Sequence, residues 1–429
     1  MSPQRLPLTA PAAGIVLARE SGPQRAREFF FLAAVVLMNY TLFRPSPVDV
    51  SFTIALALTI FCRQRITFGT FAYLALVLVW LSAMVVSSLR FLDDDEVTYQ
   101  ITKISFATSI GLGASLLAAH WSGAKLRLFL RIWIFGALIA ATLGIVGFAG
   151  GVEDFVWDGR AKGLFDDPNM YGAYLLPGIL ACVHALLTGE GRRGYHVLGG
   201  LWLTLGLLLS FSRVAIAAGL VLVALQLVIL NRRALARTLV YGAGTVVAVL
   251  VLGLIAAIFI DGFDDKVLDR FTLAKDYDLG AQGRLGRYVG SIAFILSFPG
   301  GLGLLQYERM FPEPIHNIWI SSFMNYGWTA GFAFTVLMIF AVVNAVRTYR
   351  LTRDQICLTI LFAWVAIASC AMLHEAERWR HLWLMTGLVW GLDPRNWRMI
   401  QAPRRPVGRS MPVPSERAPA LSSTAPGAA

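Results

Sequence analysis

The chain has 429 residues, of which 57% are hydrophobic and 15% charged, and its mean hydropathy is +0.63. This composition excludes an ordinary soluble domain, because such domains carry about 25% charged residues. The net charge of +11 arises from the cytoplasmic loops of the topology described below, and it therefore predicts no nucleic-acid partner.

Apolar runs of about 16–25 residues recur along the chain, and each is long enough to cross a hydrocarbon core about 30 Å thick as a helix. We therefore predict an all-α polytopic membrane protein with about twelve transmembrane helices. In chain order, the predicted spans are residues 28–43, 49–62, 67–89, 101–120, 128–150, 169–187, 196–210, 214–230, 239–260, 317–346, 355–373 and 382–392.

The predicted transmembrane domain covers residues 28–400 and is flanked by two tails. Residues 1–27 have no apolar stretch followed by a small-residue cleavage site, so we expect a cytoplasmic tail and no cleavable signal peptide. Residues 401–429 are rich in Pro, Ser and Ala and are predicted to be a disordered cytoplasmic tail.

Lysine and arginine concentrate in the tails and in the even-numbered loops, for example at Lys125 and Arg127. The positive-inside rule puts these segments in the cytoplasm. We therefore expect a multi-pass protein of the bacterial inner membrane with both termini in the cytoplasm.

The opposite, periplasmic side then has one long loop, at about residues 261–316. Within this loop, residues 288–305 are apolar enough to suggest a thirteenth span, but they include Pro299 and a Gly-Gly-Leu-Gly run. An extra span would also move the arginine-rich loop after residue 346 to the outside. We therefore expect a re-entrant or interfacial segment.

Few ionisable residues lie deep in a predicted span, and His184 is the main exception. Pumps and proton-coupled transporters place such residues along their path, so the scarcity counts against both classes. A lone histidine of this kind is more typical of packing than of a proton relay. The candidate chemistry therefore lies in the external loops.

Three external features carry candidate site residues. Arg213, in the turn SFSRV, either snorkels to lipid headgroups or binds an anion. Arg284 and Arg287, in QGRLGRY, form either a solvated basic loop or a phosphate site. His316, in EPIHNIW, is either a surface or capping residue or a catalytic one. Arginine forks hold phosphate oxygens and a neutral histidine can accept an alcohol proton, so together they suit displacement of a pyrophosphate by a hydroxyl.

The acidic pairs Asp166 with Asp167 and Asp264 with Asp265 offer a different chemistry, because two carboxylates can hold a divalent cation. Their spacing is unspecific, and solvated acidic loops are the favoured interpretation. We predict no metal site and no cofactor.

Four segments resemble the O-antigen ligase and polysaccharide polymerase superfamily, whose members act on glycans linked to polyprenyl pyrophosphate. They are GLFDDPNMYGAYL from Gly163, FSRVAIAAGLVLVAL from Phe211, GRLGRY with FPGGLGLLQY from Gly283, and HNIWISSFMNYGWTAG from His316. The segments follow one another in the family's order, with a long external loop between the last two.

The resemblance implies a metal-independent membrane glycosyltransferase that moves a glycan from undecaprenyl pyrophosphate to an acceptor hydroxyl at the periplasmic face. Such an enzyme is either a ligase or a polymerase of O-antigen or exopolysaccharide. Its expected partners are the lipid-linked glycan donor, a glycan or lipid-linked acceptor, and membrane lipids.

The resemblance also assigns roles to residues. It implies that Arg213 and Arg284 bind the diphosphate, with Arg287 as a further candidate, and that His316 engages the acceptor. It implies a supporting role for two asparagines that orient loops through hydrogen bonds, Asn169 and Asn317.

The chain departs from the family pattern at two points. Tyr288 stands where tryptophan is common, and FPGGLGLLQY is a loose version of Pro-x-x-Gly-x-Gly. Two alternative functions stay open: a transporter or flippase of lipid-linked sugars, and a non-catalytic partner of a polysaccharide assembly complex.

Overall fold

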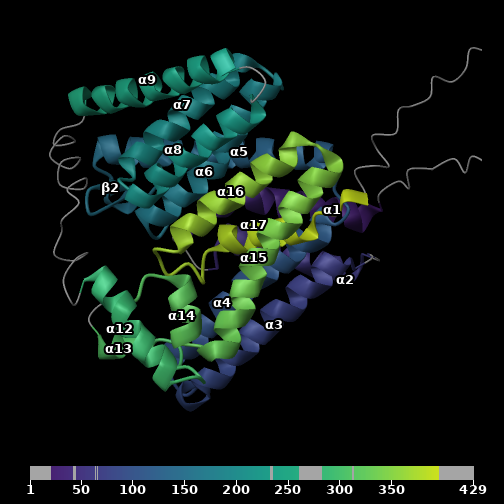
Figure 1. Cartoon of the computed structure of the whole chain (residues 1–429), viewed down its shortest axis with the longest axis vertical. Coiled ribbons are helices and arrows are strands. Elements are labelled where there is room, and N and C mark those ends of the chain that lie inside the picture. The colour runs from purple at the N-terminus through teal and green to yellow at the C-terminus, as the bar shows by residue number, and fades with distance from the viewer. Residues whose placement is uncertain are drawn as a thin grey trace, which may run out of the picture.

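The computed structural model describes residues 21–41, 45–62, 64, 66–231, 235–259, 283–311 and 314–395. Within these segments most residues are helical, as Figure 1 shows. The longer helices are α1 (Gly22–Val36), α2 (Pro47–Ile60), α3 (Phe68–Ser88), α4 (Asp95–Ala118), α5 (Gly123–Gly150), α6 (Pro168–Thr188), α7 (Arg193–Leu209), α8 (Arg213–Leu230), α9 (Leu235–Phe259), α12 (Arg284–Ser297), α15 (Gly327–Thr352), α16 (Gln355–Ala371) and α17 (Arg380–Gly391).

Short elements connect these helices. One antiparallel hairpin pairs β1 (Val156–Trp157) with β2 (Arg160–Ala161), with Val156 opposite Ala161. The short helices are η1 (Leu37–Asn39), η2 (Leu89–Phe91), η3 (Glu153–Phe155), α13 (Gln306–Met310) and α14 (Ile318–Met324).

Six helices of the described part are long and apolar enough to cross a membrane. Several outward-facing side chains are apolar and exposed, as Phe332, Ile339 and Val343 of α15 illustrate. An exposed apolar surface of this kind fits contact with lipid, and the fold is that of an all-α membrane protein. The six segments are Phe68–Phe91, Asp95–Ala118, Gly123–Gly150, Pro168–Thr188, Arg213–Leu230 and Gly327–Thr352.

Each of the twelve predicted spans overlaps a helix, and at two of them the helices have a different extent from the predicted span. The first helix begins at Gly22, inside the predicted tail, because Gln24 Oε1 accepts a hydrogen bond from the Ser21 N–H at 2.9 Å and caps the start. The tenth predicted span is two helices, α14 and α15, which are separated at Asn325 and Tyr326.

A tight glycine turn explains the break in the tenth span. The segment after α12 packs its Pro299–Gly303 turn against the α14–α15 junction, where Leu302 and Gly303 donate backbone hydrogen bonds to Met324 and Asn325, both at 2.9 Å. Gly327 has a φ of +85°, and a Cβ there would lie 2.6 Å from the Pro299 carbonyl oxygen. Only glycine allows this approach, so the chain turns there.

Helix α12 follows residues 260–282, which lie outside the described residues and include Asp264, Asp265 and the first part of the predicted periplasmic loop. It has 14 residues and exposes an apolar stripe of Val289, Ile292 and Leu296, while Ser291 is buried. It is not among the helices that are long and apolar enough to span a membrane.

Close helix packing holds the centre of the bundle. In α17, Gly387 lies directly on Gly111 of α4, since a Cβ at Gly387 would be 1.8 Å from the Gly111 carbonyl oxygen. Small residues let membrane helices approach in this way. The buried rings of Trp80 and Trp383, with centroids 5.2 Å apart, fill the adjoining core.

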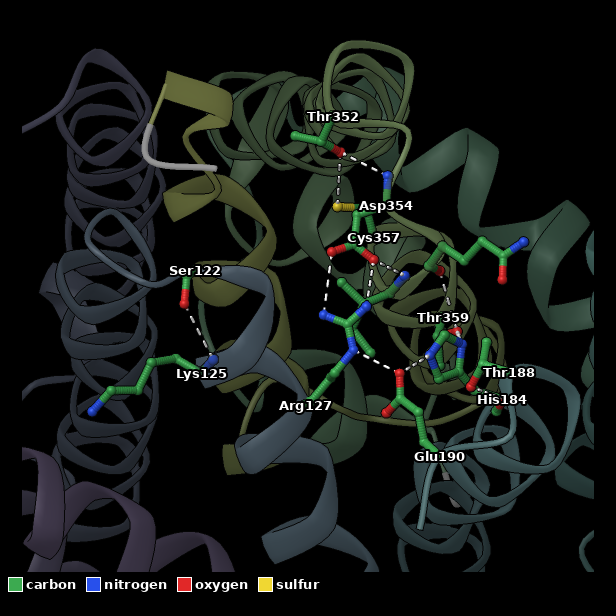
Figure 2. A network of polar contacts seen from close by, with 12 residues as sticks. Ser122, Lys125, Arg127, His184, Thr188, Glu190, Thr352, Asp354, Cys357 and Thr359 are labelled. Carbon is green, nitrogen blue, oxygen red and sulfur yellow. Dashed lines mark hydrogen bonds and ion pairs between the residues drawn. The ribbon is translucent and has the colours of Figure 1, made fainter. Parts of the chain in front are cut away.

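A polar network ties three helix ends together at one end of the bundle (Figure 2). Arg127 of α5 donates from Nε to Glu190 at 2.7 Å and from Nη1 and Nη2 to the Asp354 carboxylate at 3.2 and 2.8 Å. His184 of α6 hydrogen-bonds through Nδ1 to Thr359 Oγ1 at 2.8 Å. The start of α5, the end of α6 and the start of α16 are thus joined. The other ends of these three helices therefore lie on the opposite face of the bundle.

Candidate functional site

A cavity of about 510 Å³ opens on that opposite face. It lies where helices α2, α4, α6 and α17 begin and where the loops before α14 and after α16 meet. The topology predicted from the sequence expects all these helix ends and loops on the periplasmic side. The lining residues are Asp49, Thr53, Tyr99, Thr102, Lys103, Phe106, Ala107, Asp166, Asp167, Met170, His316, His374, Glu375, Arg378, Trp379 and Arg380.

His316 is the sequence-predicted catalytic residue that the structure places in this cavity. It is half-buried and has a left-handed backbone with φ +49°. Its carbonyl oxygen accepts a hydrogen bond from the Tyr288 hydroxyl of α12 at 3.0 Å. Next to it, Asn317 Oδ1 caps α14 by accepting from the N–H groups of Trp319 and Ile320 at 2.9 and 3.0 Å. Both contacts hold the backbone on the C-terminal side of His316.

The start of α6 forms a second wall. Asp167 is the N-cap of this helix and accepts from the N–H groups of Asn169 and Met170. Asp166 accepts from Thr41 Oγ1 at 3.3 Å. The pair that resembled a cation site in the sequence therefore has one member engaged in helix capping. Within the described residues, no group of three His, Cys, Asp or Glu side chains is arranged to hold a metal ion.

Asn169 connects this wall to Arg213 through an arginine that the sequence analysis did not single out. Arg160 of β2 donates from Nη2 to Asn169 Oδ1 at 2.8 Å and from Nε to the Ser210 carbonyl oxygen at 2.9 Å. Ser210 begins the turn that leads into α8, and Arg213 is the first residue of that helix. Among the described residues Arg213 is half-buried and does not line the cavity.

The basic segment before the apolar turn forms the first part of α12. Arg284 is the first residue of this helix, and Arg287 is buried one turn later. Burial raises the pKa of Tyr307 in α13, and the positive charge of Arg287 opposes that rise. The bond from Tyr288 to His316 brings this helix to the edge of the cavity, although Arg287 does not line it within the described part of the chain.

A charged loop missed by the sequence analysis supplies most of the remaining wall. Residues 374–381 read HEAERWRH, and they lie between α16 and the first turn of α17. Arg380 binds the Asp49 carboxylate in a bidentate way at 2.8 and 2.9 Å. His374 stacks on Trp379, with ring centroids 5.8 Å apart, and it makes an edge-to-face contact with His316, with ring centroids 6.4 Å apart. The signal was present in the sequence as six ionisable residues among eight.

The electrostatics of this loop differ from those of a solvated acidic segment. Burial, followed by the nearby carboxylates of Glu377 and Glu308, raises the pKa of Glu375 to about 8, against the opposing charge of Arg378. Burial also raises the pKa of Glu377 and of Glu308. Three carboxyl groups with raised pKa values therefore lie beside the cavity.

An apolar groove of about 530 Å³ runs between α6, α7, α8 and α9. Arg193 and His196 line it at the start of α7, and Leu208 lines it at the other end of that helix. Ile216, one turn after Arg213, also lines the groove. The groove therefore reaches from one end of the bundle to within a turn of Arg213.

Comparison with known proteins adds no assignment. No family model matches the chain, and no curated protein matches it in sequence.

Proposed function

We propose that this protein transfers a glycan from undecaprenyl pyrophosphate to a hydroxyl of an acceptor sugar. One observation carries the proposal. His316, which lines an open cavity, lies on the same face of the bundle as the starts of α8 and α12, two helices that each begin with an arginine. Tyr288 links α12 to His316, and Arg160 links the turn before α8 to the start of α6. A ligase and a polymerase share this chemistry.

The two arginine-headed helices suit a diphosphate. Helices α6 and α14, which begin at the cavity, are capped by Asp167 and Asn317, whereas α8 and α12 have no side-chain cap. A helix N-terminus carries a partial positive charge, which favours phosphate. An arginine at the first position adds a bidentate donor, which supports Arg213 and Arg284 as the residues that bind the donor diphosphate.

The apolar groove beside α8 supports a lipid-linked donor. Its lining is largely aliphatic and it ends one turn from Arg213. A polyprenyl chain needs an apolar surface within the bilayer, and its diphosphate must remain at the polar edge. The groove and Arg213 provide these two environments next to each other.

The reaction follows from these positions. The acceptor hydroxyl in the cavity attacks the anomeric carbon, the new C–O bond forms, and the bond to the pyrophosphate oxygen breaks. His316 takes the hydroxyl proton as general base. Arg213 and Arg284 stabilise the negative charge that grows on the departing diphosphate, and Arg287 adds positive charge nearby. The cavity, with Trp379 and several carboxylates, holds the acceptor sugar.

This proposal includes the finer topology. The twelve spans cross the bacterial inner membrane, both termini are cytoplasmic, and the cavity with the loop at about 261–316 faces the periplasm. The Arg127 network then lies on the cytoplasmic side.

Reconstituted transfer tests the proposal. The full-length protein in proteoliposomes receives an undecaprenyl pyrophosphate-linked oligosaccharide and an acceptor glycan, and the product is measured by mass spectrometry. We expect transfer by the wild type in the presence of a chelator. Arg213→Ala and Arg284→Ala should lose it almost completely, and His316→Ala should lower kcat by about 10²–10⁴-fold, the usual contribution of a general base.

Matched controls come from the opposite end of the bundle. His120 and Arg192 are exposed there, and His120→Ala and Arg192→Ala should keep wild-type activity. Transfer at the wild-type rate by both Arg213→Ala and Arg284→Ala would remove the diphosphate role. Movement of the lipid-linked donor across the bilayer without transfer would favour a flippase, and assembly defects in cells without transfer in vitro would favour a non-catalytic partner.

A further inference from the structure

Glu375 lies between two cavities. It lines the large cavity together with His316 and His374, and it also lines a second, smaller cavity of about 40 Å³. Arg378 is the other residue shared by both, and its Nη2 lies 3.6 Å from Glu375 Oε2. Glu375 is therefore placed to exchange a proton between the cavity in which the hydroxyl would react and the smaller cavity that it also lines.

The small cavity holds an excess of hydrogen-bond acceptors. Among the described residues, Glu375 Oε1, Glu308 Oε2 and Asn325 Oδ1 are buried atoms with no hydrogen-bond partner. Asn325 is only 1% exposed, and its Nδ2 already donates to Ser321 Oγ at 3.1 Å. Ser321 in turn hydrogen-bonds to the Glu377 carboxylate.

A proton resolves this excess. An ionised carboxylate only accepts hydrogen bonds, whereas a protonated one also donates. Buried acceptors without donors cost free energy, so a proton on one carboxyl of the group, directed at a neighbouring acceptor, stabilises the cluster. The geometry alone thus identifies a place that takes up a proton and holds it.

We propose that Glu375 receives the proton released by the acceptor hydroxyl, and that Glu308, Glu377 and Asn325 form the buried group that stabilises it there. This inference rests on the proposed transfer reaction. The hydroxyl oxygen forms the bond to the anomeric carbon, the pyrophosphate leaves with the electron pair of the broken bond, and the proton passes from the hydroxyl to His316 and then to the Glu375 carboxylate. His316 is neutral again for the next cycle.

The charge environment of Glu375 sets the pH at which it can act. The titratable and charged groups around it come from its own loop and from each element that lines the two cavities: His374, Glu377, Arg378, Arg380, Glu308, His316, Asp49, Lys103, Asp166 and Asp167. Burial, followed by the carboxylates of Glu377 and Glu308 and opposed by Arg378, puts the pKa of Glu375 at about 8. A proton acceptor works best when its pKa is close to the working pH, and it must be ionised to accept.

The pH dependence of transfer tests the role of Glu375. We expect kcat of the reconstituted wild type to rise with pH through about 8, because only the ionised carboxylate accepts the proton. Glu375→Gln keeps the shape of the side chain but cannot ionise. It should therefore lose the rising limb of the pH profile, and its kcat should fall by about 10²-fold or more. Glu375→Asp, which keeps the carboxylate, should recover part of the rate and the limb.

A second variant makes the test independent of packing. The Glu377 carboxylate raises the pKa of Glu375, so Glu377→Gln should move the rising limb to lower pH while transfer continues. A residue that only supports the loop would not shift a limb in this way. Glu153, exposed in η3 on the same face, provides the control: Glu153→Gln should match the wild type in rate and profile.

Stability provides a readout that needs no activity. The folded protein holds the Glu375 proton up to about pH 8, whereas the unfolded chain releases it near the ordinary value of 4.5. The folded state binds more protons between these values, so stability should fall as pH rises through this window, and less steeply in Glu375→Gln. If the wild type transfers glycan and Glu375→Gln keeps the wild-type rate and pH profile, this inference alone is overturned. A wild type that transfers nothing overturns the proposed function and this inference with it.

Discussion

His316 has a backbone conformation that few residues with a side chain adopt. Its φ is +49°, and two contacts hold the backbone on its C-terminal side: the Tyr288 hydroxyl donates to its carbonyl oxygen, and the Asn317 side chain caps α14. A left-handed residue costs about 1–3 kcal/mol and persists only where its surroundings fix it. Such strain at a residue that faces a cavity is typical of functional sites.

Asn317 offers a direct test of this support. Asn317→Ala removes the cap and should lower the free energy of unfolding by about 1 kcal/mol, while Asn317→Ser, which can still cap, should restore most of it. Thermal unfolding in detergent measures both. Equal stability of the Ala and Ser variants would show that the cap contributes nothing and that α14 is held by packing alone.

Among single residues, the motif positions were predictable and their partners were not. His316, Asn317 and Asn169 stand out because short motifs and loop positions mark them. Arg160 does not, because its importance comes from two contacts, to Asn169 and Ser210, that lie 9 and 50 residues away along the chain. Glu375 likewise depends on Glu308 of a distant helix. Contacts of this kind become visible only when the tertiary structure brings them together.

At the scale of elements, hydropathy located the helices but not their interruptions. Residues 317–346 form one continuous apolar stretch in the sequence, yet the chain breaks before Gly327 because the Pro299–Gly303 turn occupies the space beside it. The break depends on a segment more than 20 residues earlier, so no local pattern reports it. The same turn brings α12 to the edge of the cavity.

The junction of α5, α6 and α16 yields a stability prediction. Asp354→Asn keeps the cap of α16, where Asp354 accepts from the Ile356 N–H at 3.1 Å, but removes the charge that binds Arg127. Hydrogen bonds between charged groups contribute about 1.5–3 kcal/mol, and Arg127 is 29% exposed. We therefore expect a loss of about 2 kcal/mol, measured by denaturant unfolding in detergent.

A double-mutant cycle separates the ion pair from general effects. Arg127→Met combined with Asp354→Asn should cost less than the sum of the two single changes, because each removes the same interaction. Additive costs would mean that the bidentate contact contributes nothing to stability. Arg192→Gln, at an exposed position of the same end, should leave unfolding unchanged.

For the whole molecule, the sides predicted from the charge distribution group the same helix ends that the tertiary structure brings together. The positive-inside rule assigned helix ends to two sides from the sequence alone. The structure collects the ends assigned outside, including those that carry Asp49, Lys103, Asp167 and Arg380, around one cavity. It joins ends assigned inside through Arg127 and its partners at the other end.

This agreement predicts which residues an impermeant reagent can reach. All four native cysteines are buried, so an introduced cysteine gives a clean signal. Trp157 of the hairpin and Tyr195 of α7 are both exposed aromatic residues, at 53% and 46%, and the topology puts them on opposite sides of the membrane. In cells with a permeabilised outer membrane, a membrane-impermeant maleimide should label Trp157→Cys, whereas Tyr195→Cys should react only after the inner membrane is disrupted. The reverse pattern would place His316 and its cavity in the cytoplasm, on the side where the glycan of a translocated donor is absent, and glycan transfer at the periplasmic face would then be ruled out.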